Sequence, residues 1–113
     1  MRFRRTAGEI LYMVQQLRPN ELDETLILWW LATIEYRVLY EILGKEDIQS
    51  ETSEEEMLIG PPHDDVYWTH LLAMIDFACK DFESYKYSSA MAEKAWQECA
   101  KHYHHKKYNC ANS

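Results

Sequence analysis

Glycine, proline and long apolar segments are all scarce in this 113-residue chain. It contains three glycines and three prolines, fewer than an all-β protein with many tight turns usually needs. No run of about 18 apolar residues is present, so we expect no membrane-spanning helix. Hydrophobic residues still make up 47% of the chain, which is ordinary for one globular domain.

Basic charge is also in short supply. Lysine and arginine number 12 against 19 acidic residues, which gives a net charge of -7. A protein that grips DNA needs a Lys or Arg for each phosphate contact. We therefore expect no specific DNA binding by this chain.

The cysteines give no sign of a disulfide framework. Cys79, Cys99 and Cys110 are odd in number and show no Cys-x-x-Cys spacing, which predicts free thiols in a reducing compartment. The apolar run 7–14 follows several arginines, as in a signal peptide, but Glu9 interrupts it and no small-residue cleavage site follows. We expect a cytoplasmic protein.

The spacing of apolar residues predicts helices throughout. The expected helices cover roughly residues 7–17, 21–43, 64–79 and 82–103. Arg18 precedes Pro19 and should end the first helix, Asn20 should cap the second, and Gly44 should follow its last turn. We predict one all-α domain over 1–113, a bundle of about four helices that is ordered over 7–103. An acidic loop should lie between the second and third helices, and 1–6 and 104–113, the C-terminal tail, should be flexible.

The second helix carries two apolar stripes on different sides. One contains Ile27, Leu31, Ile34, Val38 and Ile42, and the other contains Trp29, Thr33, Tyr36 and Tyr40. A helix of this kind is central in its bundle or is covered on one side by another subunit. Both descriptions fit so small a chain.

The later helices have one expected buried side each. In the third helix it contains Tyr67, His70, Leu71, Met74, Phe77 and Ala78. Asp76 should be exposed, or should form a hydrogen bond or ion pair to a neighbouring helix, for which Arg37 is a candidate partner. A break near Lys80 and Asp81 should follow. The seam of the last helix contains Tyr85, Ser88, Ala92, Ala95, Trp96, Cys99 and Tyr103.

Some residues permit an enzymatic interpretation. Glu21 and Glu24 match the first half of the carboxylate pattern of all-α Mg²⁺-dependent nucleotide hydrolases, but the second half is missing because Gly44 stands three residues after Glu41. His102, His104 and His105 lack a fourth ligand at a usual spacing for zinc. We expect no cofactor, no metal and no enzymatic activity.

Several segments resemble the small head–tail connector proteins of siphophages and prophages of Gram-positive bacteria. Those proteins tend to carry a Pro-Asn before a Trp-Leu helix, a Leu-Leu-x-x-Pro-Tyr-Asp-x-x-Tyr segment, an Ala-Met-Ile-Asp-x-Ala helix and a Glu-Tyr-x-x-Tyr turn. This chain has corresponding residues at 19–20, 30–31, 58–67, 73–78 and 81–85. His63 replaces the commoner Tyr, and Lys80-Asp81 replaces a turn that contains glycine.

The resemblance implies a structural adaptor subunit in the virion neck, made in the bacterial host cytoplasm. It implies a ring of about twelve copies beneath the portal protein and above a tail-completion or stopper protein. DNA would pass through without specific binding. A phage regulatory binding module is an alternative, beside the nucleotide hydrolase.

The resemblance also suggests roles for three groups of residues. Trp29, Tyr36 and Tyr40 are candidates for the subunit interface. Glu51, Glu54, Glu55 and Glu56 are candidates for an acidic lining of the DNA channel or a portal-facing loop. Tyr103, His105, Lys106, Lys107 and Tyr108 are candidates for a tail that docks on the portal.

Overall fold

A computed structural model of the chain confirms the all-α architecture. It describes the backbone of residues 4–44 and 56–112, and the side chains of 4–44 and 56–104. The elements are α1 (Ala7–Leu17), α2 (Glu24–Arg37), the π-helical turn η1 (Val38–Leu43), α3 (Asp65–Ala78) and α4 (Phe82–Asn112).

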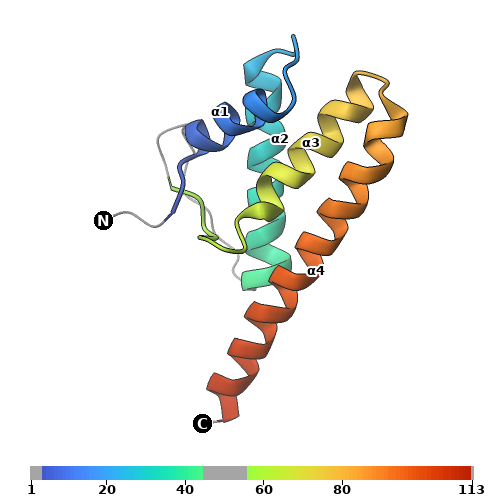
Figure 1. Ribbon diagram of the computed structural model, residues 1–113. Coiled ribbons are helices and arrows are strands. Elements are labelled where there is room, and N and C mark those ends of the chain that lie inside the picture. The colour runs from blue at the N-terminus through green and yellow to red at the C-terminus, as the bar shows by residue number, and fades with distance from the viewer. Residues whose placement is uncertain (1–3, 45–55, 113) are drawn as a thin grey trace.

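Helices α3 and α4 form an antiparallel hairpin, and α1 and α2 pack against α3 (Figure 1). The turn η1 reaches α4, but within the described residues the backbones of α2 and α4 stay apart. At 1.5 Å per residue, the 31 residues of α4 span about 46 Å, close to the longest dimension of the molecule, 49 Å. The length of α4 therefore determines the longest dimension of the molecule.

The beginning of α1 is fixed by a capping box. Thr6 Oγ1 accepts a hydrogen bond from Glu9 N, and the Glu9 carboxylate accepts one from Thr6 N, so two free helix N–H groups are satisfied. Arg5, which lies in the segment expected to be flexible, forms an ion pair with Asp64, and its carbonyl accepts a hydrogen bond from Met57 N at 2.9 Å. The end of α1 before Arg18 is as predicted.

The predicted beginning of α2 was wrong by three residues. Asp23, and not Asn20, caps the helix, with its carboxylate accepting from Thr25 N at 2.8 Å. The Asn20 side chain accepts from Leu22 N and donates to the Arg18 carbonyl, which makes a local turn that competes with helix. At the other end Gly44 has φ 68°, as expected for the residue that ends a helix in the left-handed region.

The break between α3 and α4 lies where the sequence placed it. Lys80 has φ 61°, and Asp81 Oδ1 accepts from Ser84 N at 3.2 Å to begin α4. The predicted end of this last helix at Tyr103 falls inside α4, which continues to Asn112. No glycine or proline follows residue 62, so nothing in the sequence requires the helix to stop there.

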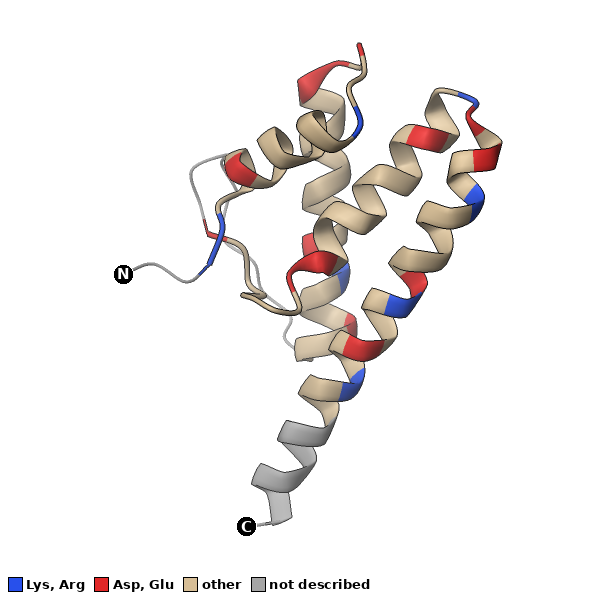
Figure 2. Cartoon of the chain, in the orientation of Figure 1, with Lys and Arg blue, Asp and Glu red and all other residues tan. Residues whose placement is uncertain are grey.

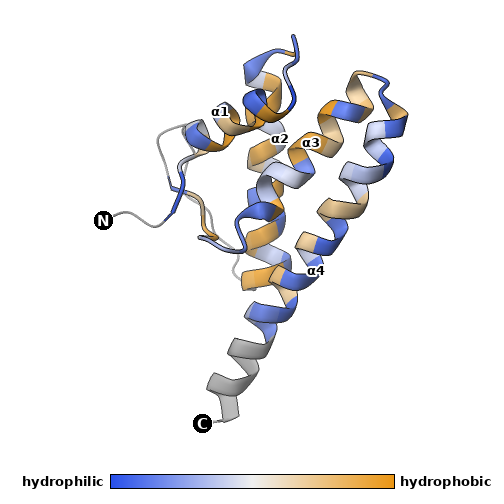
Figure 3. Cartoon of the chain, in the orientation of Figure 1, coloured by the Kyte–Doolittle hydropathy of each residue, from blue (hydrophilic) through white to orange (hydrophobic). Residues whose placement is uncertain are grey.

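The core lies where α1, α2 and α3 meet. Ala95 and Cys99, on the buried side of α4, complete it. Figure 3 shows apolar residues along α1, α2 and α3 and mixed polarity along α4. Charged residues of both signs follow the length of α4, and few lie on α1 (Figure 2). The core is contiguous, and its most deeply buried side chains are Ile10, Val14, Leu31, Val38, Ile59, Val66, Tyr67, Leu71, Ile75 and Cys99.

Glu35 is buried in this core and holds the segment after the acidic loop. Its Oε1 accepts a hydrogen bond from the Tyr67 hydroxyl at 2.6 Å, and its Oε2 accepts from Leu58 N at 2.9 Å. The Tyr67 oxygen in turn accepts from Ile59 N at 3.0 Å. One carboxylate thus joins α2, α3 and residues 58–59.

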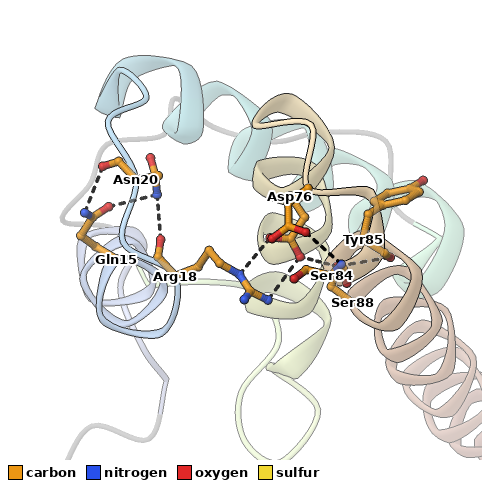
Figure 4. A network of polar contacts seen from close by, with 8 residues as sticks. Gln15, Arg18, Asn20, Asp76, Ser84, Tyr85 and Ser88 are labelled. Carbon is orange, nitrogen blue, oxygen red and sulfur yellow. Dashed lines mark hydrogen bonds and ion pairs between the residues drawn. The ribbon is translucent and has the colours of Figure 1, made fainter.

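Asp76 is not exposed, and Arg37 is not its partner, but the predicted ion pair to another element of the fold is present. Asp76 is buried and forms an ion pair with Arg18, whose Nε lies 2.8 Å from Oδ1, and its Oδ2 accepts from the Ser88 hydroxyl at 2.8 Å. Figure 4 shows how this carboxylate joins the end of α1 to α3 and α4. The apolar spacing of α3 could not reveal it, because the cation lies 58 residues away.

Two other residues differ from the predicted pattern. Phe77 and Ala78, which were expected on the buried side of the third helix, are exposed. Both belong to the last turn of α3, so helical periodicity alone overestimated burial at this end of the helix.

Candidate functional site

The second stripe of α2 is exposed in the single chain. Trp29, Tyr36 and Tyr40 have relative accessibilities of 67%, 46% and 48%. At 100° per residue Trp29 and Tyr36 lie on the side of α2 opposite Leu31, which is buried, and Tyr40 continues their row on η1. We call Trp29, Thr33, Tyr36 and Tyr40 the aromatic stripe.

The rings of the aromatic stripe form a ridge along α2. The Tyr36 and Tyr40 ring centroids are 5.2 Å apart, and the Thr33 hydroxyl donates to the Trp29 carbonyl at 3.0 Å. Large amphipathic rings with few rotatable bonds are enriched where proteins meet. The stripe therefore has the composition of a contact surface.

A second apolar surface was not predicted from the sequence. It is a groove of about 740 Å³ between α2 and α4, with α3 as its floor, and we call it the α2–α4 groove. Its principal lining residues are Trp30, Ile34 and Arg37 from α2, His70, Met74 and Phe77 from α3, and Tyr85, Ala92 and Trp96 from α4.

Aromatic contacts support both ends of the α2–α4 groove. Near the end toward η1, the Arg37 guanidinium carbon lies 4.6 Å from the Trp96 ring centroid, and the His70 ring meets the edge of Trp96 at 5.4 Å. Near the α3–α4 turn, the Phe77 ring lies 5.4 Å from Tyr85. These contacts hold large side chains at the rim of the groove.

The polar groups of the groove already have partners within the chain. His70 Nδ1 lies 2.7 Å from the Val66 carbonyl oxygen, to which it donates, and Arg37 Nε donates to Glu41 Oε2 at 2.9 Å. Burial lowers the pKa of His70, and Arg37 adds to that decrease. The groove thus presents a mostly uncharged, apolar floor at neutral pH.

The buried carboxylate of α2 lacks the geometry of a catalytic acid. Burial raises the pKa of Glu35, and its bonds to the Tyr67 hydroxyl and Leu58 N partly oppose that increase. The same burial, together with the Glu35 carboxylate, raises the pKa of the Tyr67 hydroxyl. Both groups are enclosed, and their bonding atoms are directed at each other and at backbone N–H groups, so they stabilise the fold.

The residues considered for metal binding do not form a ligand set within the described part of the chain. Glu21 and Glu24 are exposed near the beginning of α2, and the His63 ring stacks 4.6 Å from the His102 ring. Within 4–44 and 56–104, no group of three or more His, Cys, Asp or Glu residues is placed to hold a metal ion. Burial also raises the pKa of the Cys99 thiol to about 11, which disfavours the reactive thiolate.

The other predicted surfaces fall largely outside the described side chains. Glu51, Glu54 and Glu55 lie in the part of the chain that is not described, whereas Glu56 is exposed and bridges to Thr6. Tyr103 is half-buried, with its ring 5.1 Å from that of His102. The side chains of His105, Lys106, Lys107 and Tyr108 are outside the described residues.

Two findings concern the chain as a whole. Among the helices described, none has the length and apolar character to cross a membrane. Compared with known families, curated proteins and solved structures, the chain gives no match.

Proposed function

We propose that this chain is a structural head–tail adaptor subunit of a tailed bacteriophage. It would form a ring of about twelve copies beneath the portal protein and continue the DNA channel toward a tail-completion or stopper protein. The resemblance of residues 19–85 to connector proteins suggests this role. The observation that carries the proposal is the exposed aromatic stripe of α2, opposite the core.

Physical reasoning supports a contact role for this surface. The Trp29 side chain, 67% exposed, lies on the same ridge as two tyrosines. An isolated exposed apolar residue is normal, but a continuous row of large rings on one helix marks an interaction site. Buried aromatic side chains also supply much of the binding energy at protein interfaces.

An acidic channel lining is the second part of the proposal. Negative side chains around a channel repel DNA phosphates, so that the genome slides and does not adhere. Glu56 is exposed, and Glu51, Glu54 and Glu55 precede it. We expect Glu54→Lys, Glu55→Lys and Glu56→Lys together to impair particle assembly or DNA ejection. Normal assembly and ejection in this variant would contradict the lining.

The adaptor role is tested by sequencing a few kilobases of DNA on either side of the gene. We expect portal, protease and major-capsid reading frames upstream and tail genes downstream. Neighbouring genes for metabolism or nucleotide salvage would contradict the proposal. In that case Mg²⁺ binding, and its loss on substitution of Glu21 or Glu24, would be the next measurements.

A further inference from the structure

We propose that the aromatic stripe of one copy seats in the α2–α4 groove of a second copy. This inference deepens the proposed function, since it names the two surfaces that meet between subunits. A head-to-tail ring requires two different patches on each chain, because each copy must offer one and accept the other. The aromatic stripe and the groove are two such patches.

The two surfaces have complementary shapes. The stripe is a ridge, because its residues are spaced by three or four positions and rise from one side of α2. The groove is concave, with α2 and α4 as walls and α3 as floor. A ridge of large rings in an apolar groove resembles the packing of helices by ridges and grooves in protein cores.

The two surfaces also have matching chemistry. The stripe has no acidic or basic residue. The groove has Trp30, Trp96 and Arg37 at its walls, and Trp, Tyr and Arg are the residue types that contribute most to interface energies. Arg37 and His70 already have bonding partners within the chain, so covering the groove need not leave them unsatisfied.

The exposed parts of the three rings supply a share of the area that a specific contact needs. An aromatic side chain buries about 150–250 Å² when it is fully covered. Because the three rings are 67%, 46% and 48% exposed, covering them removes about 240–400 Å² of surface on the stripe side. A standard interface buries about 800 Å² per partner, so the rings supply roughly a third to a half of that share and flanking residues must supply the remainder.

The directions of the two surfaces allow one chain to use both at once. Trp29 belongs to the stripe and Trp30 to the groove, so these two positions are offset by about 100° around α2, and Thr33 lies at the border between the two surfaces. The large rings of the stripe lie outside the groove, which lets a copy insert its stripe into one neighbour while it accepts the stripe of another. The contact is heterologous and can extend from copy to copy until a ring closes.

The test uses two variants, each lacking one surface. The stripe variant is Trp29→Ser with Tyr36→Ser, and the groove variant is Phe77→Glu with Gln97→Glu, which places charge toward both ends of the groove. All four positions are exposed, so the folds should survive, and thermal melts verify this. The control is Tyr12→Ser with Tyr87→Ser, since these tyrosines are 70% and 69% exposed and belong to neither surface.

Sedimentation velocity is measured for each protein alone and for an equimolar mixture, up to about 1 mM, where even a weak contact is half occupied. We expect the natural chain and the tyrosine control to form species larger than dimers. Each surface variant alone should associate at least about tenfold more weakly. Their mixture should form one-to-one pairs and nothing larger, because only one intact stripe and one intact groove remain.

Three results would overturn the inference: a natural chain that stays monomeric, a surface variant that associates like the natural chain, or a mixture that fails to pair. The adaptor role can fail separately. Pairing in the mixture without phage genes beside the gene would support the contact and contradict the adaptor role. Phage genes beside the gene, together with a mixture of variants that does not pair, would support the adaptor role and contradict the contact.

Discussion

The two sides of α2 contain similar kinds of residues and have different surroundings. On one side Leu31 lies in the core together with residues of α1 and α3, and Glu35 bonds to Tyr67 and Leu58. On the other side Trp29 and Tyr36 face outward. A single helix therefore separates the residues that hold this domain together from those available to other proteins. The two sides should respond differently to substitution.

The largest difference should come from truncating one large residue on each side. Leu31→Ala removes a side chain that is 1% exposed, and we expect it to cost about 3 kcal/mol of unfolding free energy. Trp29→Ala removes a larger side chain from the exposed side, and it should change stability by less than about 0.5 kcal/mol. Urea denaturation measures both. Similar losses for the two variants would refute the division of α2.

The buried carboxylate of α2 should have the next largest effect. Glu35→Ala leaves the Tyr67 hydroxyl and Leu58 N without their acceptor, and we expect a loss of about 2 kcal/mol. Glu35→Gln retains one acceptor oxygen and should lose about half as much. Denaturant midpoints decide between these values. Equal stability of the alanine variant and the natural chain would show that this network does not hold residues 58–59.

The Arg18–Asp76 pair should contribute less, because the Arg18 side chain is 36% exposed and its charge is partly screened. Asp76→Asn keeps an acceptor for Ser88 and removes the ionic contact, so we expect a loss of about 1.5 kcal/mol. The matched control is Glu41→Gln, which removes the exposed Arg37–Glu41 pair and should cost less than about 0.5 kcal/mol. If the two substitutions cost the same in thermal melts, burial adds nothing to the ion pair.

The smallest effect concerns pH. Because burial raises the pKa of Glu35 in the folded state, the folded chain holds the proton more tightly than the unfolded chain does. The contribution of Glu35 to the free energy of unfolding should thus be greatest below the pKa of the unfolded chain, near 4.5. It should be lost as the pH rises through the higher pKa of the folded chain. Measuring unfolding free energies of the natural chain and Glu35→Gln between about pH 4 and 8 isolates this term. A difference that does not vary with pH would contradict the raised pKa.

Much of this fold follows from local signals in the sequence. The end of α1 before Pro19, the left-handed residue Gly44 and the break at Lys80-Asp81 were predicted from short-range chemistry. The separation of the aromatic stripe from the buried stripe also followed from helical periodicity. These features depend on neighbours within a few residues, which a sequence displays directly.

The features that escaped prediction depend on long-range geometry. The buried Asp76 is paired with Arg18, which follows the end of α1. No local pattern in the sequence predicts which cation such a carboxylate meets. Asp23 caps α2 in place of Asn20, because the Asn20 side chain already forms hydrogen bonds with the backbone of Arg18 and Leu22. The α2–α4 groove exists because the backbones of α2 and α4 stay apart, and helix spacing of that kind is set by tertiary packing.

The most direct test of the central claim is to mix this chain with the portal protein that the proposed function places beside its gene and to measure the mass of any complex by native mass spectrometry. We predict a ring of about twelve copies for the natural chain. We predict loss of that ring for Trp29→Ser with Tyr36→Ser, at an unchanged melting temperature. Failure of the natural chain to form a ring, or an identical ring formed by the variant, would contradict the account.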